Sequence, residues 1–375
     1  MQLFSKSMLI VKQCFEPSFG GPAEDFEKFL VGKTVKTFTV ISHPLNDKSY
    51  PFSTLAQYDN GTLTRFIKVP RRKFGLFSRF IDLFIFSLDS KFEIVIGFNA
   101  FSTIIGYFKN RCRRAIYLNW FVDFVPSKKL SDKVYLLFEG YSARICNFWI
   151  ENTIEAAAAR KKRTLIANKV SNIIIPIGIW KEQILSSDYL KKGYKVCYFG
   201  SIDSRNGADL LANVILQTLR INEDIEFHVI GKGPKLSMLK NYFPEYLLSR
   251  IKFYGAIEDI NEAITIMNEC KIGLAPYTNE LHNFSQYANP GKLIRYLACG
   301  LHIMTTKVPP NHKFLELETG AKVFETTSSA SDWADAINHL IIDDLILRDK
   351  QRLSLIAASN LTNEDLFNGL LDAIS

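Results

Sequence analysis

The chain has 375 residues, of which 47% are hydrophobic and 22% are charged, a composition that indicates a folded globular protein and excludes intrinsic disorder. The length favours two domains, and with no run of 18 apolar residues we expect no membrane-spanning helix. The N-terminal segment lacks the apolar region of an export signal, and six scattered cysteines without a CxxC pair predict free thiols in a reducing compartment.

The net charge of +8 is unevenly distributed along the chain. Residues 1–185 contain 27 Lys and Arg against 15 Asp and Glu, whereas residues 186–375 contain 19 against 23. The first half is therefore basic, with a net charge of +12, and the second half is mildly acidic, with a net charge of −4. This asymmetry indicates an anionic partner for one half only, and lipid, nucleic acid and a charged substrate all fit it.

Short β-branched or aromatic runs alternate with helical patterns along the whole chain. In the first half we predict strands at residues 8–11, 36–42, 93–98 and 115–120, and helices at 22–31, 76–88, 100–109 and 131–147. After residue 180 we predict strands within 194–200, 225–231, 251–255, 271–277 and 302–306, and helices at 206–219, 235–242, 259–269 and 289–299. Strands that alternate with helices in this way predict two Rossmann-like α/β domains with doubly wound parallel sheets, residues 1–180 and 181–360.

Glycine-rich turns follow several of the predicted strands, at the edge where doubly wound sheets bind ligands. They lie in "SFGGPAEDF" (18–26), "FGSIDSRNGADLL" (199–211) and "VIGKGPKL" (229–236). In the last of these, Leu236 replaces the third glycine of a dinucleotide fingerprint, which disfavours NAD. The chain has no GxxxxGK[ST] segment, which excludes a P-loop ATPase, and no DxD pair, so we expect neither a metal ion nor a further cofactor.

The segment "NPGKLIRYLACGLHIMTT" (289–306) raises a question of charge. Lys292 lies in the first turn of a predicted helix, where the helix dipole is positive and a cation alone is unfavourable. Backbone N–H groups and Lys292 together would stabilise an anion at this helix start. The pattern therefore predicts an anionic ligand at the helix start.

The second half resembles the C-terminal domain of group 1 (family 4-like) glycosyltransferases with the GT-B fold. The segments that carry the resemblance stand in the family's order: "YFGSIDSRNGADLL", "FHVIGKGP", "IKFYGAIEDI", "CKIGLAPYTNE" and "NPGKLIRYLACGLHIMTT". "NWFVDFVP" (119–126), "FWIENTIEAAAARKK" (148–162) and "IIIPIGIW" (173–180) resemble N-domain and hinge segments. The resemblance implies two domains facing across a cleft, a nucleotide sugar on the C-terminal domain, an acceptor on the N-terminal domain, and a last helix, within 361–375, that returns to the N-terminal domain.

On the donor side, the resemblance assigns roles to several residues. Lys292 stands where the family lysine approaches the nucleotide diphosphate, and Arg205 stands where a second phosphate contact is expected. Gly233, Tyr277 and Glu280 are placed on the same nucleotide-binding side.

Arg295 departs from the family pattern. Many members carry a glutamate there that accepts hydrogen bonds from the ribose, and an arginine cannot accept. Either another group such as Glu280 holds the ribose, or Arg295 binds the diphosphate or a carboxylate of the donor sugar. The family's pair of acids eight residues apart is also missing, which favours an inverting over a retaining mechanism.

On the acceptor side, Asp123 is the predicted catalytic base. It follows a predicted strand in "NWFVDFVP", and a carboxylate there suits deprotonation of an acceptor hydroxyl. Glu24 and Asp25, after Gly20 and Gly21, are its rivals, although acids in a first helical turn are also favoured by the helix dipole alone.

The segment 65–88 combines basic and bulky apolar residues. Its cations include Arg71, Arg72, Lys73 and Arg79, and such a pattern is typical of an interfacial membrane helix. A core helix with basic flanks explains it equally well. No nucleic-acid-binding module is recognised, so no nucleic-acid partner is expected.

These observations give one main hypothesis of function. The protein is predicted to be a glycosyltransferase of the hexosyltransferase class that moves a sugar from a nucleotide-diphosphate sugar to a saccharide or polyprenyl-linked acceptor. It is expected to act in surface polysaccharide synthesis, in the cytoplasm on the inner face of the cell membrane. Two alternatives stay open: a sugar-nucleotide epimerase of the same fold, and a non-catalytic partner subunit.

Overall fold

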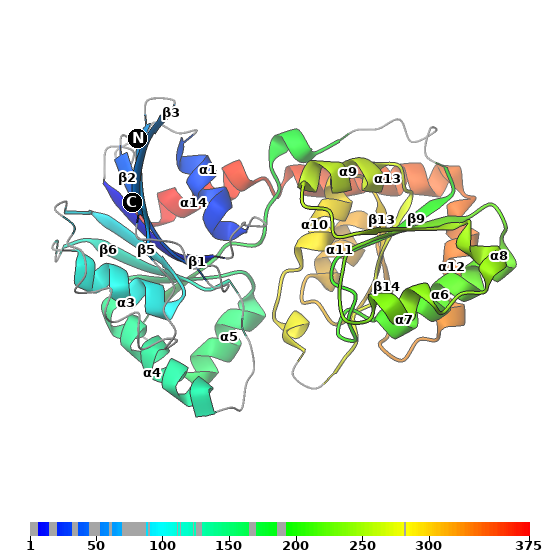
Figure 1. The fold of residues 1–375 in the computed structure, drawn as a ribbon, viewed down its shortest axis with the longest axis horizontal. Coiled ribbons are helices and arrows are strands. Elements are labelled where there is room, and N and C mark those ends of the chain that lie inside the picture. The colour runs from blue at the N-terminus through cyan, green and yellow to red at the C-terminus, as the bar shows by residue number, and fades with distance from the viewer. Residues whose placement is uncertain are drawn as a thin grey trace. The chain divides into compact units, whose positions relative to one another are not determined.

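The computed structural model divides into two compact units, which we describe one at a time (Figure 1). Unit 1 comprises Met1–Pro176 and Leu366–Ser375, and unit 2 comprises Ile177–Asp365. The structure describes residues 7–14, 21–31, 37–44, 53–59, 62–69, 88, 91–110, 112, 114–122, 124, 130–164, 170–185, 193–280 and 283–375.

Unit 1 is built on an eight-stranded sheet with the order β3-β4-β2-β1-β5-β6-β7-β8. All neighbouring strands are parallel except β3 and β4, which form an antiparallel edge. The strands are β1 (Met8–Cys14), β2 (Thr37–Pro44), β3 (Ser53–Asp59), β4 (Thr62–Lys68), β5 (Ile94–Phe98), β6 (Ile116–Trp120), β7 (Phe148–Glu151) and β8 (Ser171–Ile174). The described helices of unit 1 include α1 (Pro22–Val31), α3 (Ala100–Lys109), α4 (Leu130–Ile145) and α5 (Ile154–Arg163).

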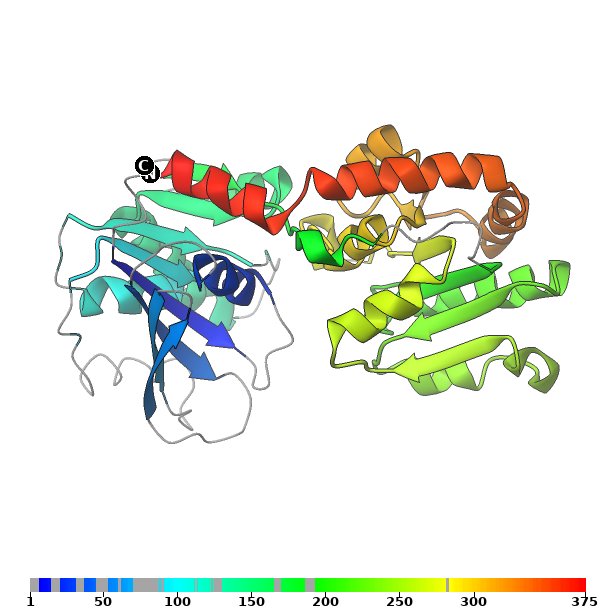
Figure 2. The same cartoon turned by 90° about the horizontal axis from the view of Figure 1, so that it is seen from above.

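The last helix, α14 (Asn363–Ala373), contributes its residues from Leu366 onward to unit 1. The ring of Phe367 lies edge-on to Phe26 and Phe29 of α1, with ring centroids 5.3 and 5.4 Å apart, and its centroid is 6.0 Å from that of Trp120. Figure 2 shows α14 beside the sheet of unit 1. Aromatic burial thus attaches the C-terminal end of the chain to the core of its first unit.

Unit 2 contains a six-stranded parallel sheet with the order β11-β10-β9-β12-β13-β14. This is the 3-2-1-4-5-6 order of a Rossmann-like domain, and it reverses direction between β9 and β12. The strands are β9 (Lys195–Phe199), β10 (Glu226–Ile230), β11 (Ile251–Gly255), β12 (Ile272–Ala275), β13 (His302–Thr306) and β14 (Lys322–Phe324). Among the helices are α6 (Ala208–Ile221), α7 (Leu236–Lys240), α8 (Glu245–Leu248), α9 (Ile260–Asn268), α10 (Gly291–Ala298), α11 (His312–Thr319), α12 (Ala330–Ile341) and α13 (Asp344–Ser359).

Two hydrophobic clusters form the core of unit 2. One joins Leu211 and Ile215 of α6 to Trp333 of α12, and the other joins Leu293 and Leu297 of α10 to neighbouring strands and helices. Strands β9, β10, β12 and β13 are mostly buried on both faces, as is usual in parallel sheets, whereas the edge strands β11 and β14 have exposed residues.

The predicted fold class, α/β with Rossmann-like parallel sheets in two domains, is confirmed. The antiparallel β3–β4 pair was not predicted, because the side chains of residues 53–57 are exposed and their sequence shows no apolar alternation. The helix predicted at 131–147 ends at Ile145, while the one predicted at 76–88 lies outside the described residues except for Leu88. Within the described parts of the chain, the search for a helix of membrane-spanning length and hydropathy finds none.

Candidate functional site

The strand order of unit 2 places a candidate site at the carboxyl ends of β9 and β12. Ligands of doubly wound sheets bind where the strand order reverses, because the loops that leave the two adjacent strands diverge there. The loop after β9 runs from Gly200 to Gly207, and the loop after β12 begins at Pro276. Thr278 N–H donates to the Arg205 carbonyl across these loops at 3.1 Å.

Two glycines let these loops approach one another closely. A Cβ atom on Gly207, whose φ is +76°, would lie 1.7 Å from the Pro276 carbonyl oxygen. A Cβ atom on Gly233, in the loop after β10, would lie 2.2 Å from the Ile202 carbonyl oxygen. Gly233 was predicted to contact the nucleotide, and in the structure it provides backbone packing beneath the site.

Lys292 enters this site from the first turn of α10 and is only 8% exposed. Its Nζ lies 3.2 Å from Asn206 Oδ1 and 3.4 Å from the Tyr198 hydroxyl. The amine also faces two aromatic rings, 4.5 Å from the centroid of Tyr198 and 4.8 Å from that of Tyr277. The side chain predicted to meet an anion is therefore enclosed by hydrogen-bond acceptors and π faces.

The charge of Lys292 is poorly compensated in the ligand-free protein. Burial lowers the pKa of Lys292 from 10.5 to about 7, and the more distant carboxylate of Asp203 only partly opposes this effect. Among the described residues, Lys292 forms no ion pair within 4.0 Å. An anion that entered the site would supply the missing charge and return the amine to its protonated form.

Asp203 organises the loop after β9. Its Oδ1 accepts from the backbone N–H and the side-chain amide of Asn206, both at 2.9 Å, and its Oδ2 lies 3.3 Å from Arg205 Nη2. Partial burial alone would raise the pKa of Asp203, but these hydrogen bonds and Arg205 lower it below its usual value. Asn206 is thereby fixed with its own Oδ1 toward Lys292.

The other predicted donor-side residues take different positions around the loops. Arg205 is exposed, with its guanidinium 4.8 Å from the ring centroid of Phe284. Tyr277 is buried under Lys292, which raises the pKa of its phenol, whereas Glu280 is exposed.

Arg295 folds back toward the start of α10. A Cβ atom on Gly291 would lie 2.7 Å from Arg295 Nη1, so the guanidinium covers the first turn that carries Lys292. Its Cζ is also 5.8 Å from the ring centroid of Phe199, the last residue of β9. The structure therefore brings Arg295 and Lys292 to the same helix start.

In unit 1, the predicted acceptor-side acids surround a buried cation. Lys12 of β1 is 8% exposed, and its Nζ lies 3.1 Å from Glu24 and 2.9 Å from Glu27. Burial alone would lower the pKa of Lys12, but the two carboxylates outweigh it and raise the pKa. Glu24 is thus engaged in an ion pair that sequence patterns did not show, because Lys12 lies on a strand and not on the same helix.

Of the other residues predicted on the acceptor side, the structure describes Gly21 and Asp25 at the start of α1. Gly21 directly precedes α1, and its carbonyl accepts from the Asp25 N–H at 2.9 Å in the first helical turn. Gly20 lies outside the described residues. The structure therefore places Asp25 at a helix N-terminus, the position that the dipole alone favours.

Asn99 marks the corresponding reversal of strand order in unit 1, between β1 and β5. It follows β5 with φ +101° and ψ 164°, a region that few residues other than glycine adopt, and its side chain accepts from Ser102 N–H at 2.9 Å. Such backbone strain, worth about 1–3 kcal/mol, is concentrated at functional sites in proteins. Sequence analysis missed Asn99. The one sequence signal for it is that an asparagine, and not a glycine, stands in the one-residue turn between the strand that contains Gly97 and the helix that follows.

Asp123, the predicted base, lies outside the described residues, but both of its neighbours are held in place. Asn152 donates to the Val122 carbonyl at 2.6 Å. The Cζ atom of the buried Arg160 lies 3.6 Å from the ring centroid of Phe121 and 5.3 Å from that of Phe124.

Arg160 belongs to a buried ion cluster that lies next to Phe121 and Phe124. Arg160 pairs with Glu139 of α4 and with Glu151 of β7, and all three side chains are at most 1% exposed. Burial would lower the pKa of Arg160, but the two glutamates raise it, so its charge is secure. The cluster thus holds in place the guanidinium against which Phe121 and Phe124 pack.

Comparison with known proteins follows the same division of the chain. Residues 193–343 match the family model described as "Glycosyl transferases group 1". A search of curated protein sequences found no match.

Solved structures resemble the whole chain. Sucrose-phosphate synthase from Thermosynechococcus elongatus is 14% identical with a TM-score of 0.70, covering 98% of this chain and 100% of its own. HepE from Anabaena, solved with UDP, is 12% identical with a TM-score of 0.68, covering 98% and 99%. WaaG, a glycosyltransferase involved in lipopolysaccharide biosynthesis, is 14% identical with a TM-score of 0.64, covering 98% and 99%. The chain therefore has the GT-B fold.

The buried amine makes a prediction for the ligand-free protein. Because the folded-state pKa of Lys292 is about 7 and its unfolded value is 10.5, the folded state binds this proton less tightly. The free energy of unfolding must then fall as the pH is lowered from 10.5 to 7, by at most about 1.4 kcal/mol per pH unit from this group. We expect Lys292→Met to be more stable than wild type at pH 7, with a difference that shrinks toward pH 10.5. Urea unfolding at a series of pH values measures this, and a difference independent of pH would contradict the buried, uncompensated amine.

Proposed function

We propose that the protein is a glycosyltransferase that transfers a sugar from a nucleotide-diphosphate sugar to an acceptor hydroxyl. The observation that carries the proposal is the buried Lys292 amine at the strand-order reversal of unit 2, within the residues that match the group 1 glycosyltransferase model. A diphosphate is the anion that this position suits best, because Lys292 and the N–H groups at the start of α10 face it together.

The structural neighbours support the choice of a uridine nucleotide for the first tests. HepE has been solved with UDP and with UDP-glucose. The family match favours a transferase over the epimerase and over a non-catalytic subunit, since the matched model is one of transferases. We place the donor on unit 2 and the acceptor on unit 1, and we propose a saccharide or polyprenyl-linked acceptor of surface polysaccharide synthesis.

Three cations divide the work at the proposed donor site. Lys292 would contact the diphosphate directly, and its charge would stabilise the leaving nucleotide as the glycosidic bond to it breaks. Arg205, on the exposed side of the loop after β9, would add a second phosphate contact. Arg295, beside the helix start, would bind the diphosphate or a carboxylate of the donor sugar.

A decisive assay incubates the protein with labelled nucleotide sugars, with and without lipid-linked saccharide acceptors, in the presence and absence of EDTA. A transferase releases nucleoside diphosphate and labels the acceptor, and we expect this to survive EDTA. An epimerase changes the sugar without an acceptor. If the protein binds nucleotide sugars but turns over none of them, it is a non-catalytic subunit and the proposal is contradicted.

UDP binding should depend on Lys292 and should take up a proton. At pH 8 about nine tenths of an amine with a pKa near 7 is neutral, and a bound diphosphate raises that pKa. We expect uptake of close to one proton at pH 8 and less at pH 6.5, measured by calorimetry in buffers of different ionisation enthalpy. Lys292→Gln should abolish this uptake and weaken UDP binding by about 1–3 kcal/mol.

The matched control is Lys240→Gln, which removes an exposed lysine on α7 of the same unit. It should bind UDP like the wild type. Unchanged affinity in a folded Lys292→Gln variant would remove Lys292 from the donor site.

For the chemical step we propose Asp123 as the general base of an inverting transfer. It would take the proton of the acceptor hydroxyl as that oxygen attacks opposite the leaving diphosphate. Asp123→Asn keeps the shape and removes the base, so turnover should fall by about 10²–10⁴ while UDP affinity stays near wild type. Glu155→Gln, at an exposed residue of α5, is the control.

Two outcomes would overturn this assignment. Turnover retained in Asp123→Asn eliminates Asp123 and directs the next tests to Glu24 and Asp25. A product with retained anomeric configuration removes the need for a base on unit 1 altogether.

We further propose that the basic first half of the chain attaches the protein to the inner, anionic face of the cell membrane. Changing Arg71, Arg72, Lys73 and Arg79 together to Gln should release the protein from anionic vesicles, since each cation near such a surface contributes about 1 kcal/mol. Flotation at low salt measures this, and wild-type protein that does not float with the vesicles would leave the core-helix interpretation standing. The control changes four exposed lysines of unit 2: Lys181, Lys240, Lys252 and Lys313.

A further inference from the structure

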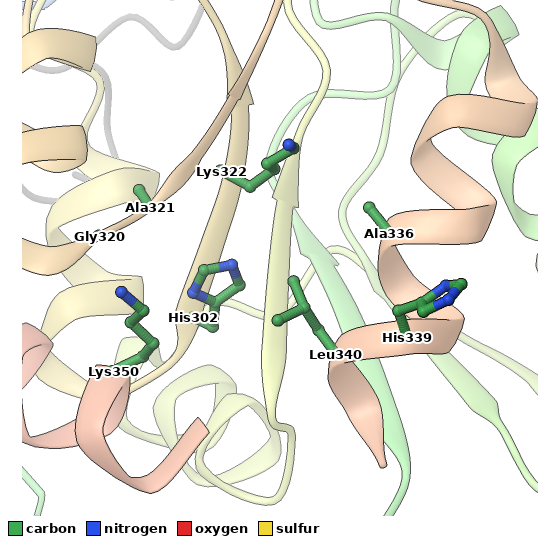
Figure 3. A pocket seen from close by; sticks show the side chains of 8 residues that line it. All are labelled: His302, Gly320, Ala321, Lys322, Ala336, His339, Leu340 and Lys350. Atoms are coloured by element: carbon green, nitrogen blue, oxygen red, sulfur yellow. The ribbon is translucent and has the colours of Figure 1, made fainter. Parts of the chain in front are cut away.

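Unit 2 contains a cavity that lies away from the donor site (Figure 3). It has a volume of about 330 Å³ and is lined by His302, Gly320, Ala321, Lys322, Ala336, His339, Leu340 and Lys350. His302 is the first residue of β13, whereas Thr306, the last residue of that strand, donates to the Tyr277 carbonyl next to the donor site at 2.8 Å. The cavity and the donor site therefore lie at opposite edges of the same sheet.

His302 is the feature of this cavity that calls for a ligand. The side chain is 3% exposed, and among the residues that the structure describes neither ring nitrogen has a hydrogen-bond partner. Buried polar side chains nearly always have one, so an unpartnered ring implies a bound water, ion or small molecule. Burial, together with Lys350 and Lys322, lowers the pKa of His302 to about 4. The neutral ring at pH 7 therefore offers one N–H donor.

The charges around the cavity select the sign of the ligand. Lys322 and Lys350 both act on His302, and no carboxylate is among the cavity's lining residues. Lys350 lies beside the His302 ring, whereas the exposed amine of Lys322 points away from it (Figure 3). Both lysines line the cavity, and their charges disfavour a metal cation and favour an anion.

Gly320, at the C-terminal end of α11, leaves the space that the Lys350 amine occupies. Lys350 lies over Gly320, since a Cβ atom there would be 2.0 Å from its Nζ, and Figure 3 shows Lys350 beside the His302 ring. His339 contributes less, because its Nδ1 lies 3.0 Å from the Asp335 carbonyl of its own helix.

We propose that this cavity binds a small phosphate-bearing molecule, with the phosphate group held by Lys322, Lys350 and the N–H of His302. Phosphate oxygens accept strong charge-assisted hydrogen bonds from ammonium groups. The volume exceeds what a phosphate alone needs and is typical of small-molecule sites, so the rest of the ligand is a compact group with an apolar face packed against Leu340 and Ala336. The ligand is separate from the nucleotide sugar, which the proposed function assigns to the opposite edge.

The test follows His302 directly by NMR of the full-length protein labelled on its histidine rings. The chain has six histidines, so His302→Gln identifies the resonance. Inorganic phosphate and glucose 6-phosphate are titrated separately, with acetate as the anion control. We expect saturable shifts of the His302 ring with both phosphates and a tighter midpoint for the sugar phosphate if the remainder of the cavity contributes.

Three variants separate this site from the donor site. The double variant Lys322→Gln with Lys350→Gln should weaken phosphate binding at His302 by about tenfold or more. The charge-matched double variant Lys240→Gln with Lys313→Gln should bind phosphate at His302 as the wild type does. Lys292→Gln should do the same, because its predicted defect is in UDP binding at the donor site.

The proposal is overturned if the His302 ring does not shift with either phosphate, if acetate shifts it equally, or if the charge-matched variant loses as much affinity as the cavity variant. In that event Lys350 only stabilises the C-terminal end of α11 and Lys322 is a surface residue. Lys350→Gln then lowers the thermal midpoint of unfolding, and added phosphate does not change that midpoint. A thermal midpoint that phosphate raises in wild type but not in the folded cavity variant supports the site independently.

Discussion

Lys292 holds a side-chain amine out of water at the point where the strand order of unit 2 reverses. Burial removes the hydration of a charged amine. The loops around it are closely packed, since Gly207 lies against the Pro276 backbone and Gly233 against the Ile202 backbone. The protein meets this cost by lowering the pKa of Lys292 to about 7 and by surrounding the amine with Asn206 and two tyrosine rings. Under the proposed function, the diphosphate of the donor would supply the charge that complements this amine.

Unit 1 solves the same problem in another way. Lys12 is as buried as Lys292 and lies on β1, beside the reversal of strand order in unit 1, but Glu24 and Glu27 contact it and raise its pKa. A cation already paired with two carboxylates has little to offer a phosphate. The contrast between the two lysines supports our proposal that the anionic donor binds unit 2 and the acceptor binds unit 1.

The sequence predicted most central strands, and the helix that carries Lys292, because parallel strands are continuous apolar runs and α10 has one apolar stripe. It did not predict β3, whose exposed residues carry no such pattern. At the site, Lys292 and the helix dipole led to the prediction of an anion, and this stays a prediction. The burial of that amine could not be seen, because Tyr198, Asn206 and Tyr277 come from two other strand ends and meet it only through long-range packing.

Arg295 gives the donor site a charge that does not titrate. Its guanidinium covers the first turn of α10, so it stays positive beside Lys292 even when the amine is neutral. Asp203, in the loop after β9, already contacts Asn206 and Arg205, and Glu280 is exposed. Under the proposed function, a diphosphate at this helix start would meet a positive charge even when Lys292 is neutral. The arginine that stands in place of the expected glutamate would then contact either the diphosphate or a carboxylate of the donor sugar, since a guanidinium donates to both and cannot accept from a ribose hydroxyl.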